Sequence, residues 1–126
     1  MPTLTKIIEA LKKAIPELRD TGTRAIEQSG LYLYLDTIRA ESRNKDSVTL
    51  QILIAGKSLT GDKNAIMPLI ESTRERVRQA ENDFNGMDMF KSVQAVSFEG
   101  ALYIYAMTLE TEIYREVLHG EILQET

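Results

Sequence analysis

Few residues of this chain could carry out chemistry, and they are far apart in the sequence. His119 is the only histidine and the chain has no cysteine, so no set of imidazole and thiolate ligands is available for a metal ion. Asp36 lies in an otherwise apolar, alternating stretch, but no second acid or base stands at a fixed spacing from it. The sequence therefore predicts no catalytic residue, no metal site and no cofactor, and we expect the protein not to be an enzyme.

The tripeptide Gly56-Lys57-Ser58 matches the end of a phosphate-binding loop. That loop also needs a glycine five residues earlier, where this chain has Gln51, and a helix that begins at once. Here the tripeptide follows a predicted strand and is followed by polar loop residues. The match is therefore predicted to be accidental, without a nucleotide site.

Two helices are predicted from apolar residues at helical spacing. The first covers residues 4–15 and ends or bends at Pro16, because proline cannot donate the next hydrogen bond. The second covers about residues 65–84 and ends at Asn85-Gly86, where glycine can adopt the left-handed conformation of a helix end.

The second helix is predicted to begin at a side-chain cap, Asp62 or Asn64. Its outer face is predicted to carry opposite charges three and four residues apart. These residues are Glu71, Arg74, Glu75, Arg78 and Glu81.

Strands are predicted where apolar residues alternate with a period of two. They cover residues 31–39, 47–56, 91–98 and 101–111, with a possible short strand near 24–27. The expected fold is a two-layer α+β domain in the order α-β-β-α-β-β, with a mostly antiparallel sheet of four or five strands and two helices on one face. It forms a single domain over residues 1–126, with a loose polar tail at 120–126.

The last part of the chain allows two interpretations. Residues 112–126 could continue the final strand or form a short amphipathic helix through Ile113, Val117 and Leu118. The alternation between Leu109 and Ile113 favours the strand.

Four tyrosines alternate with aliphatic residues in two similar strands, Gly30-Leu-Tyr-Leu-Tyr-Leu and Ala101-Leu-Tyr-Ile-Tyr-Ala. They are Tyr32, Tyr34, Tyr103 and Tyr105. On a sheet face without a third layer they would form a surface for a partner, since tyrosine is favoured at interfaces. Alternatively, they only occupy a half-exposed sheet, where tyrosine has high strand propensity.

Charge is unevenly distributed along the chain, whose net charge is −4. Residues 1–60 carry nine Lys/Arg and seven Asp/Glu, whereas residues 61–126 carry six and twelve. An acidic chain is a poor candidate for binding nucleic acid, which needs a basic surface. The asymmetry suits head-to-tail association of identical subunits, or is simply an acidic surface that keeps the protein in solution.

The longest uninterrupted aliphatic run is only residues 52–55, and the first residues lack the features of a secretory signal. We therefore expect no membrane partner and a cytoplasmic location.

Several features together resemble the tail terminator (tail completion) proteins of tailed phages, in particular the minor tail proteins of Mu-like phages and prophages. The features are the opening helix Leu4-Thr-Lys-Ile-Ile-Glu-Ala-Leu11, the strand at residues 50–54, the Gly61-Asp62 loop before a long helix, and the closing strand from Phe98-Glu-Gly-Ala-Leu-Tyr-Ile-Tyr105 to Leu109-Glu-Thr-Glu-Ile113. The resemblance implies a structural protein of virion assembly. It forms a homo-oligomeric ring, commonly a hexamer, that caps the tail tube and helps join the tail to head–tail connector proteins.

Under this resemblance the protein is cytoplasmic during assembly and then part of the virion tail. The family has no catalytic residues to carry over. Subunit and tube contacts are expected on the tyrosine-bearing strands, the loops at 41–46 and 57–64 and the acidic end of the last strand. Besides the four tyrosines, the candidate interface residues are Arg43, Lys45, Lys57, Glu110 and Glu112.

The alternative is a type III secretion chaperone, which is also acidic and of similar length. Such chaperones work as dimers that hold an extended effector segment by strand addition and groove packing. A third helix over residues 113–124 would favour the chaperone, whereas a long final strand would favour the tail terminator.

Overall fold

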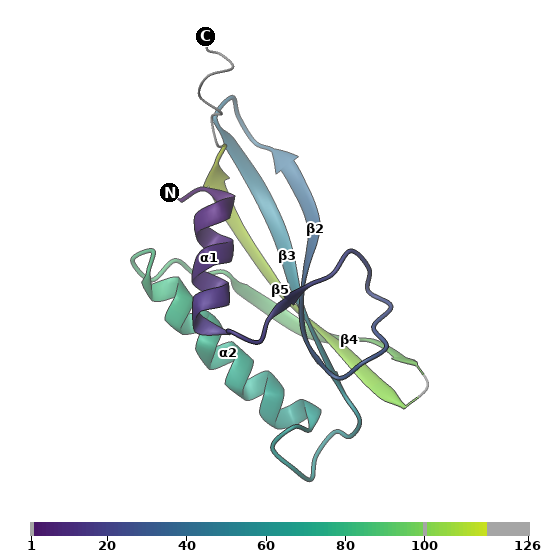
Figure 1. Cartoon of the computed structure of the whole chain (residues 1–126). Helices are drawn as coiled ribbons and strands as arrows, with labels where there is room; N and C mark the ends of the chain where they lie inside the picture. Colours follow the sequence, from purple (N-terminus) through teal and green to yellow (C-terminus); the bar gives the residue numbers. More distant parts are fainter. Residues whose placement is uncertain (1, 100, 116–126) are drawn as a thin grey trace.

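Two helices and five strands form an α+β domain in the computed structural model, which describes residues 2–99 and 101–115 (Figure 1). The helices are α1 (Leu4–Ala14) and α2 (Ile66–Asn82), and the strands are β1 (Arg19–Asp20), β2 (Gly30–Ala40), β3 (Lys45–Gly56), β4 (Phe90–Glu99) and β5 (Leu102–Tyr114). The predicted class, a mostly antiparallel sheet with two helices, is confirmed. The order along the chain is α-β-β-β-α-β-β, with one short strand more than the predicted series.

The strands form one sheet in the spatial order β1-β2-β3-β5-β4, in which only the β1–β2 pair is parallel. The extra strand is β1, not the stretch 24–27 that the sequence suggested. The reason is local: the Thr21 hydroxyl donates to the Thr23 carbonyl, and the Thr23 hydroxyl accepts from the Ala25 N–H. These turns give the backbone partners other than a neighbouring strand.

Helix α1 is capped by Thr3, whose hydroxyl accepts a hydrogen bond from the Lys6 N–H at 3.4 Å. The helix ends at Ala14, two residues before Pro16, as predicted. Its apolar stripe buries Ile7 and Leu11 against the sheet and α2.

Helix α2 begins at Ile66 without a side-chain cap, so the predicted caps are wrong. Asp62 instead accepts a hydrogen bond from the Asn64 N–H at 2.7 Å, within the loop. The first helical N–H groups are satisfied by loop carbonyls, as in the 2.9 Å bond from Ile66 to the Ser58 oxygen. At the other end, Gly86 has φ +73° as its left-handed role requires, and its N–H donates to the Glu81 carbonyl.

Glu81 is not on the outer face of α2, as the helical spacing suggested, but is only 8% exposed. One carboxylate oxygen accepts hydrogen bonds from the N–H groups of Met89 at 2.7 Å and Phe90 at 3.1 Å. The turn at Gly86 brings the start of β4 back against the last turn of α2. The carboxylate therefore joins the helix to the strand. On the exposed side of α2, the predicted pair of Glu75 and Arg78 is present, with a 3.1 Å separation.

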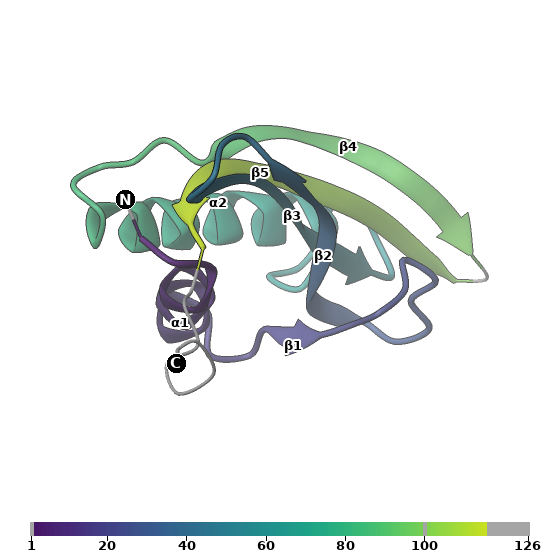
Figure 2. The same ribbon diagram turned by 90° about the horizontal axis from the view of Figure 1, so that it is seen from above.

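Both helices pack on the same face of the sheet, which we call the helix side. Figure 2 shows that the sheet is strongly curved. The main core lies between these layers and is built from β3 and β5 residues at alternate positions, together with both helices. Its largest fully buried members include Ile7, Leu11, Leu50, Ile52, Ile54, Ile66, Met107 and Leu109.

The opposite face of the sheet, which we call the open face, has its own smaller apolar cluster. Its buried members are Ile26, Tyr32, Leu53, Ala55, Leu102, Ile104 and Ala106. Ile26 belongs to the connection between β1 and β2, so this connection covers one end of the open face. The remainder of that face carries polar residues such as Thr49 and Glu110.

Strand β5 continues through Tyr114, so residues 112–114 of the uncertain end are strand. The Tyr114 N–H donates to the Pro2 carbonyl at 2.9 Å, which places the start of the chain beside the end of β5. Residues 116–126, including His119, and Gly100 in the predicted turn lie outside the described residues.

Candidate functional site

The outer half of β2 is the most exposed regular segment of the sheet. Every residue from 35 to 40 is exposed, although the segment is paired with β3. Leu35 and Ile38 lie on the helix side, opposite Leu50 and Val48, yet they are 45% and 49% exposed. The helices therefore do not cover this end of the sheet.

The outer edge of this segment is also open. Strand β1 pairs only with Tyr32 and Leu33, and the Thr21 N–H adds one bond to the Leu33 carbonyl. From residue 34 to residue 40, the side of β2 that faces away from β3 has no strand partner among the described residues. Asp36 is an extra residue at a β-bulge between Leu35 and Thr37.

The other edge of the sheet is β4, which pairs only with β5 in the described part of the chain. Two bulges interrupt it, at Lys91 and at Val96. Bulges and charged residues are common devices that restrict pairing at edge strands. The bulged residues of the two edges differ in charge: that of β2 is Asp36, and the first of β4 is Lys91.

Arg115 holds the turn between β2 and β3 against the end of β5. Its guanidinium donates to Asp46 at 2.8 Å and to the carbonyl oxygens of Ser42 and Arg43. This arrangement gives the exposed β2–β3 hairpin a defined shape where it extends beyond the helices.

Four charged candidate interface residues lie in or beside the hairpin, and two of them form an ion pair with each other. Lys45 and Glu112 form an ion pair at 3.4 Å across β3 and β5. Arg43 is exposed in the turn, and Glu110 is exposed on the open face opposite Thr49. Of these four residues, Arg43 and Glu110 keep their charged groups without an ion-pair partner among the described residues.

The four tyrosines do not form one surface. Tyr32 and Tyr34 pack with the open-face cluster, whereas Tyr103 and Tyr105 pack against the main core on the helix side. The idea of one tyrosine-lined partner surface is therefore wrong. The register explains it, since Tyr32 lies opposite Leu53 and Tyr105 lies opposite its neighbour Ile54, and neighbouring strand residues point to opposite faces.

Tyr32 has a clear internal role and is only 9% exposed. Its hydroxyl donates to the Gln28 carbonyl at 2.9 Å and accepts from Arg19 at 3.1 Å. The Arg19 guanidinium also lies 4.8 Å from the ring centroid. Tyr32 thus anchors the connection between β1 and β2 and is not available to a partner.

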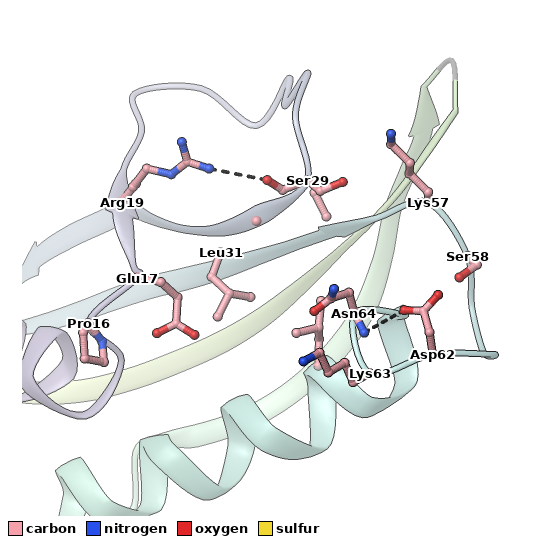
Figure 3. Close-up of a pocket in the computed structure, with 13 residues that line it drawn as sticks. Pro16, Glu17, Arg19, Ser29, Leu31, Lys57, Ser58, Asp62, Lys63 and Asn64 are labelled. Carbon is pink, nitrogen blue, oxygen red and sulfur yellow. Dashed lines mark hydrogen bonds between the residues drawn. The ribbon is translucent and has the colours of Figure 1, made fainter.

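The opposite end of the sheet contains Lys57, which lines an open cleft of about 960 Å³ (Figure 3). The charged groups around it are of both signs, with Arg19 and Lys63 on one hand and Glu17 and Asp62 on the other. Ser58 is followed by a loop, and α2 begins only at Ile66. The tripeptide therefore lacks the helix that a phosphate loop needs directly after it.

Glu17 at the rim of this cleft is held by Arg76 of α2. The guanidinium donates to both carboxylate oxygens, at 2.8 and 2.6 Å. These hydrogen bonds lower the pKa of Glu17 from its usual value and raise the pKa of Arg76. The pair joins α2 to the segment after α1, which is a structural role.

Within residues 2–99 and 101–115, no group of three or more acidic, histidine or cysteine side chains could hold a metal ion. No helix in that part of the chain is long and apolar enough to cross a membrane.

The sequence pattern does not distinguish Leu35 and Ile38 as interface residues. They continue the apolar alternation of the strand, so they resemble core residues. The feature of the sequence that could identify them is their position next to the polar stretch 41–46. That stretch forms the turn of the hairpin where the sheet extends past its helices.

The comparisons with known proteins assign no family: no protein-family model and no curated protein matches this sequence.

Proposed function

We propose that the protein is a structural subunit of a phage or prophage tail, which assembles into a ring on the tail tube and contributes to head–tail joining. The observation that supports this best is the pair of open edges, β2 and β4, at the two sides of one sheet. Because the edges differ, contact between them would be heterologous. Such contacts produce a closed ring when the rotation between subunits closes.

The β2–β3 hairpin adds a second argument. It extends beyond the helix layer, carries the exposed Leu35 and Ile38, and is braced by Arg115. An exposed but well-ordered element suits a contact between subunits or with the tube, since little order must be gained on binding. On this proposal the partners are copies of the chain, the tail tube and connector proteins. The expected location is the cytoplasm during assembly and then the virion tail.

A type III secretion chaperone remains the second candidate, because an open strand edge beside exposed apolar side chains also suits an extended effector segment. The described end of the chain favours the first proposal. Ile113 and Tyr114, which would begin the chaperone's third helix, belong to strand β5.

The test is the absolute mass in solution, measured by light scattering behind a sizing column over a range of protein concentrations at low and high salt. A salt-sensitive ring, or a monomer that forms rings on concentration, would support the tail proposal. Negative-stain microscopy of the same fractions would show whether the oligomer is a closed ring. A dimer that is unchanged by concentration and by salt would contradict the tail proposal and favour the chaperone.

A further inference from the structure

We infer that residues 34–40 on the β2 edge of one copy bind the beginning of the β4 edge of the next copy, with Asp36 beside Lys91. This inference rests on the proposed ring, and it names the surfaces that would form it. The occupant of the open edge is thus a second copy of this chain.

The direction of pairing follows from the sheet. Adjacent strands in the series β2-β3-β5-β4 are all antiparallel, so β2 and β4 of one copy run in opposite directions. A further copy placed by rotation about an axis along the strands would bring its β4 antiparallel to β2. Antiparallel pairing gives the stronger hydrogen-bond ladder. The helix side of one sheet would then continue into the helix side of the next.

Charge selects between the possible pairings. Asp36 and Lys91 are both exposed, and neither forms an ion pair with a described residue. Two β2 edges would bring Asp36 near Asp36, and two β4 edges would bring Lys91 near Lys91. Like charges directly opposite one another weaken a strand pair, whereas opposite charges stabilise it. Among pairings that set one bulged residue beside the other, only that of β2 with β4 brings opposite charges together.

One antiparallel register extends this complementarity. With Leu35 opposite Val93 and Ile38 opposite Phe90, helix-side residues meet helix-side residues, and the bulged Asp36 and Lys91 lie one position apart across the contact. The N–H groups of Met89 and Phe90 are already held by Glu81, so the ladder in this register would use residues 91–93. Contact at residues 88–90 would be made by side chains.

Apolar burial supplies the rest of the contact. Leu35 and Ile38, 45% and 49% exposed, lie on the helix side. Phe90 and Val93 of β4 are only partly buried on that same side, opposite Leu109 and Met107. Joining the two edges would place these pairs of side chains together and cover the apolar end of β2.

The first experiment is a charge swap followed by light scattering or sedimentation over a concentration series. Asp36→Lys and Lys91→Asp should each lower the association constant per contact by about 2- to 30-fold, because an attractive cross-strand pair becomes a repulsive one. The double variant, and an equimolar mixture of the two single variants, should restore association. In the mixture, the lysine introduced by Asp36→Lys meets the aspartate introduced by Lys91→Asp. The other contacts then join the unchanged Asp36 of one variant to the unchanged Lys91 of the other.

Glu71→Lys and Lys63→Asp are matched controls, since they change the net charge by the same amounts at exposed positions away from both edges. Circular dichroism and thermal unfolding would confirm that all variants remain folded. If the wild type forms rings and the edge variants behave like these controls, the inferred contact is wrong while the ring proposal stands. If the wild type is a fixed dimer, or a monomer at every concentration, the inferred contact is also wrong.

A cross-link gives an independent result, because the chain contains no cysteine. Opposite residues in an antiparallel pair have Cα atoms about 4.5–5.5 Å apart, which a disulfide can span. The variant carrying both Leu35→Cys and Val93→Cys, which are opposite in this register, should form covalent multimers on mild oxidation, the largest with as many subunits as the ring. Leu35→Cys alone should give no covalent dimer. Dimers from that single variant would show that like edges meet and would overturn the inference.

Discussion

Replacing Glu81 with alanine should destabilise the fold more than any substitution of an exposed glutamate on the same helix. The carboxylate accepts two backbone hydrogen bonds, from Met89 at 2.7 Å and Phe90 at 3.1 Å. Hydrogen bonds to charged groups contribute about 1.5–3 kcal/mol each, and an unsatisfied buried N–H adds its own desolvation penalty. Met89 is completely buried, so water cannot replace the lost acceptor there, whereas Phe90 is only partly buried. We expect a loss of about 2–4 kcal/mol in the free energy of unfolding.

The assay is urea unfolding, supported by thermal unfolding. An unfolding entropy of about 2.1 cal/mol/K per residue implies that each kcal/mol lowers Tm by roughly 4 °C in a chain of this size. Glu81→Ala should therefore lower Tm by roughly 8–15 °C. Glu81→Gln keeps one acceptor oxygen but no charge and should lie between alanine and the wild type.

The control is Glu71→Ala, which makes the same chemical change at an exposed position of α2. It should alter the free energy of unfolding by no more than about 0.5 kcal/mol. The reasoning would be refuted if Glu81→Ala unfolded within that same margin of the wild type, because the two hydrogen bonds would then contribute nothing.

Two further substitutions test other parts of the fold. Glu17→Gln should cost only about 0.5–1 kcal/mol at pH 7, because the side chain of Glu17 is 53% exposed. Arg76 lowers the pKa of Glu17 below its ordinary value of 4.5, so the contribution of the pair is present above pH 4.5 and is lost as the pH falls through the lowered pKa. Urea unfolding over a pH series should therefore show the variant approaching the wild type as the pH falls below 4.5, and a gap that did not shrink would contradict the ion-pair account. Gly56→Ala should destabilise by about 1–3 kcal/mol, because a new Cβ would lie 3.2 Å from the Ile66 side chain. Gly22→Ala is the control in thermal unfolding, because no neighbouring atom lies within 4 Å of its new Cβ. If both substitutions lowered Tm equally, crowding against Ile66 would not be the cause of the loss at Gly56.

The sequence was sufficient to predict both helices and the four long strands, because local periodicity determines them. It was insufficient where a tertiary contact overrides the local pattern. Glu81 follows the charged spacing of an outer face, but the return of the chain at Gly86 places it under β4. The strand β1 has only two residues, and no periodicity is measurable over that length.

The candidate site illustrates a different limit. Both tyrosine strands have the same alternation, but the face of each tyrosine depends on the register between strands. Tyr32 lies opposite Leu53 of β3, whereas Tyr103 lies opposite Gly56 of the same strand. Because an odd number of positions separates Leu53 from Gly56, the two tyrosines point to opposite faces of the sheet. A single-residue change of register would move every side chain to the other face. No feature of either strand alone carries that information.

The exposed end of β2 is held in place by polar contacts and not by packing against the hydrophobic core. Arg115 joins Asp46 and the carbonyls of the turn, and Lys45 joins Glu112, so the end of β5 supports the hairpin where α1 and α2 do not. A hairpin fixed in this way keeps its edge extended and its side chains in place before any partner arrives. The entropy lost on association is then smaller than for a flexible loop. Exposure of Leu35 and Ile38 on such a fixed segment therefore favours a role in binding over simple tolerance of apolar residues at a mobile surface.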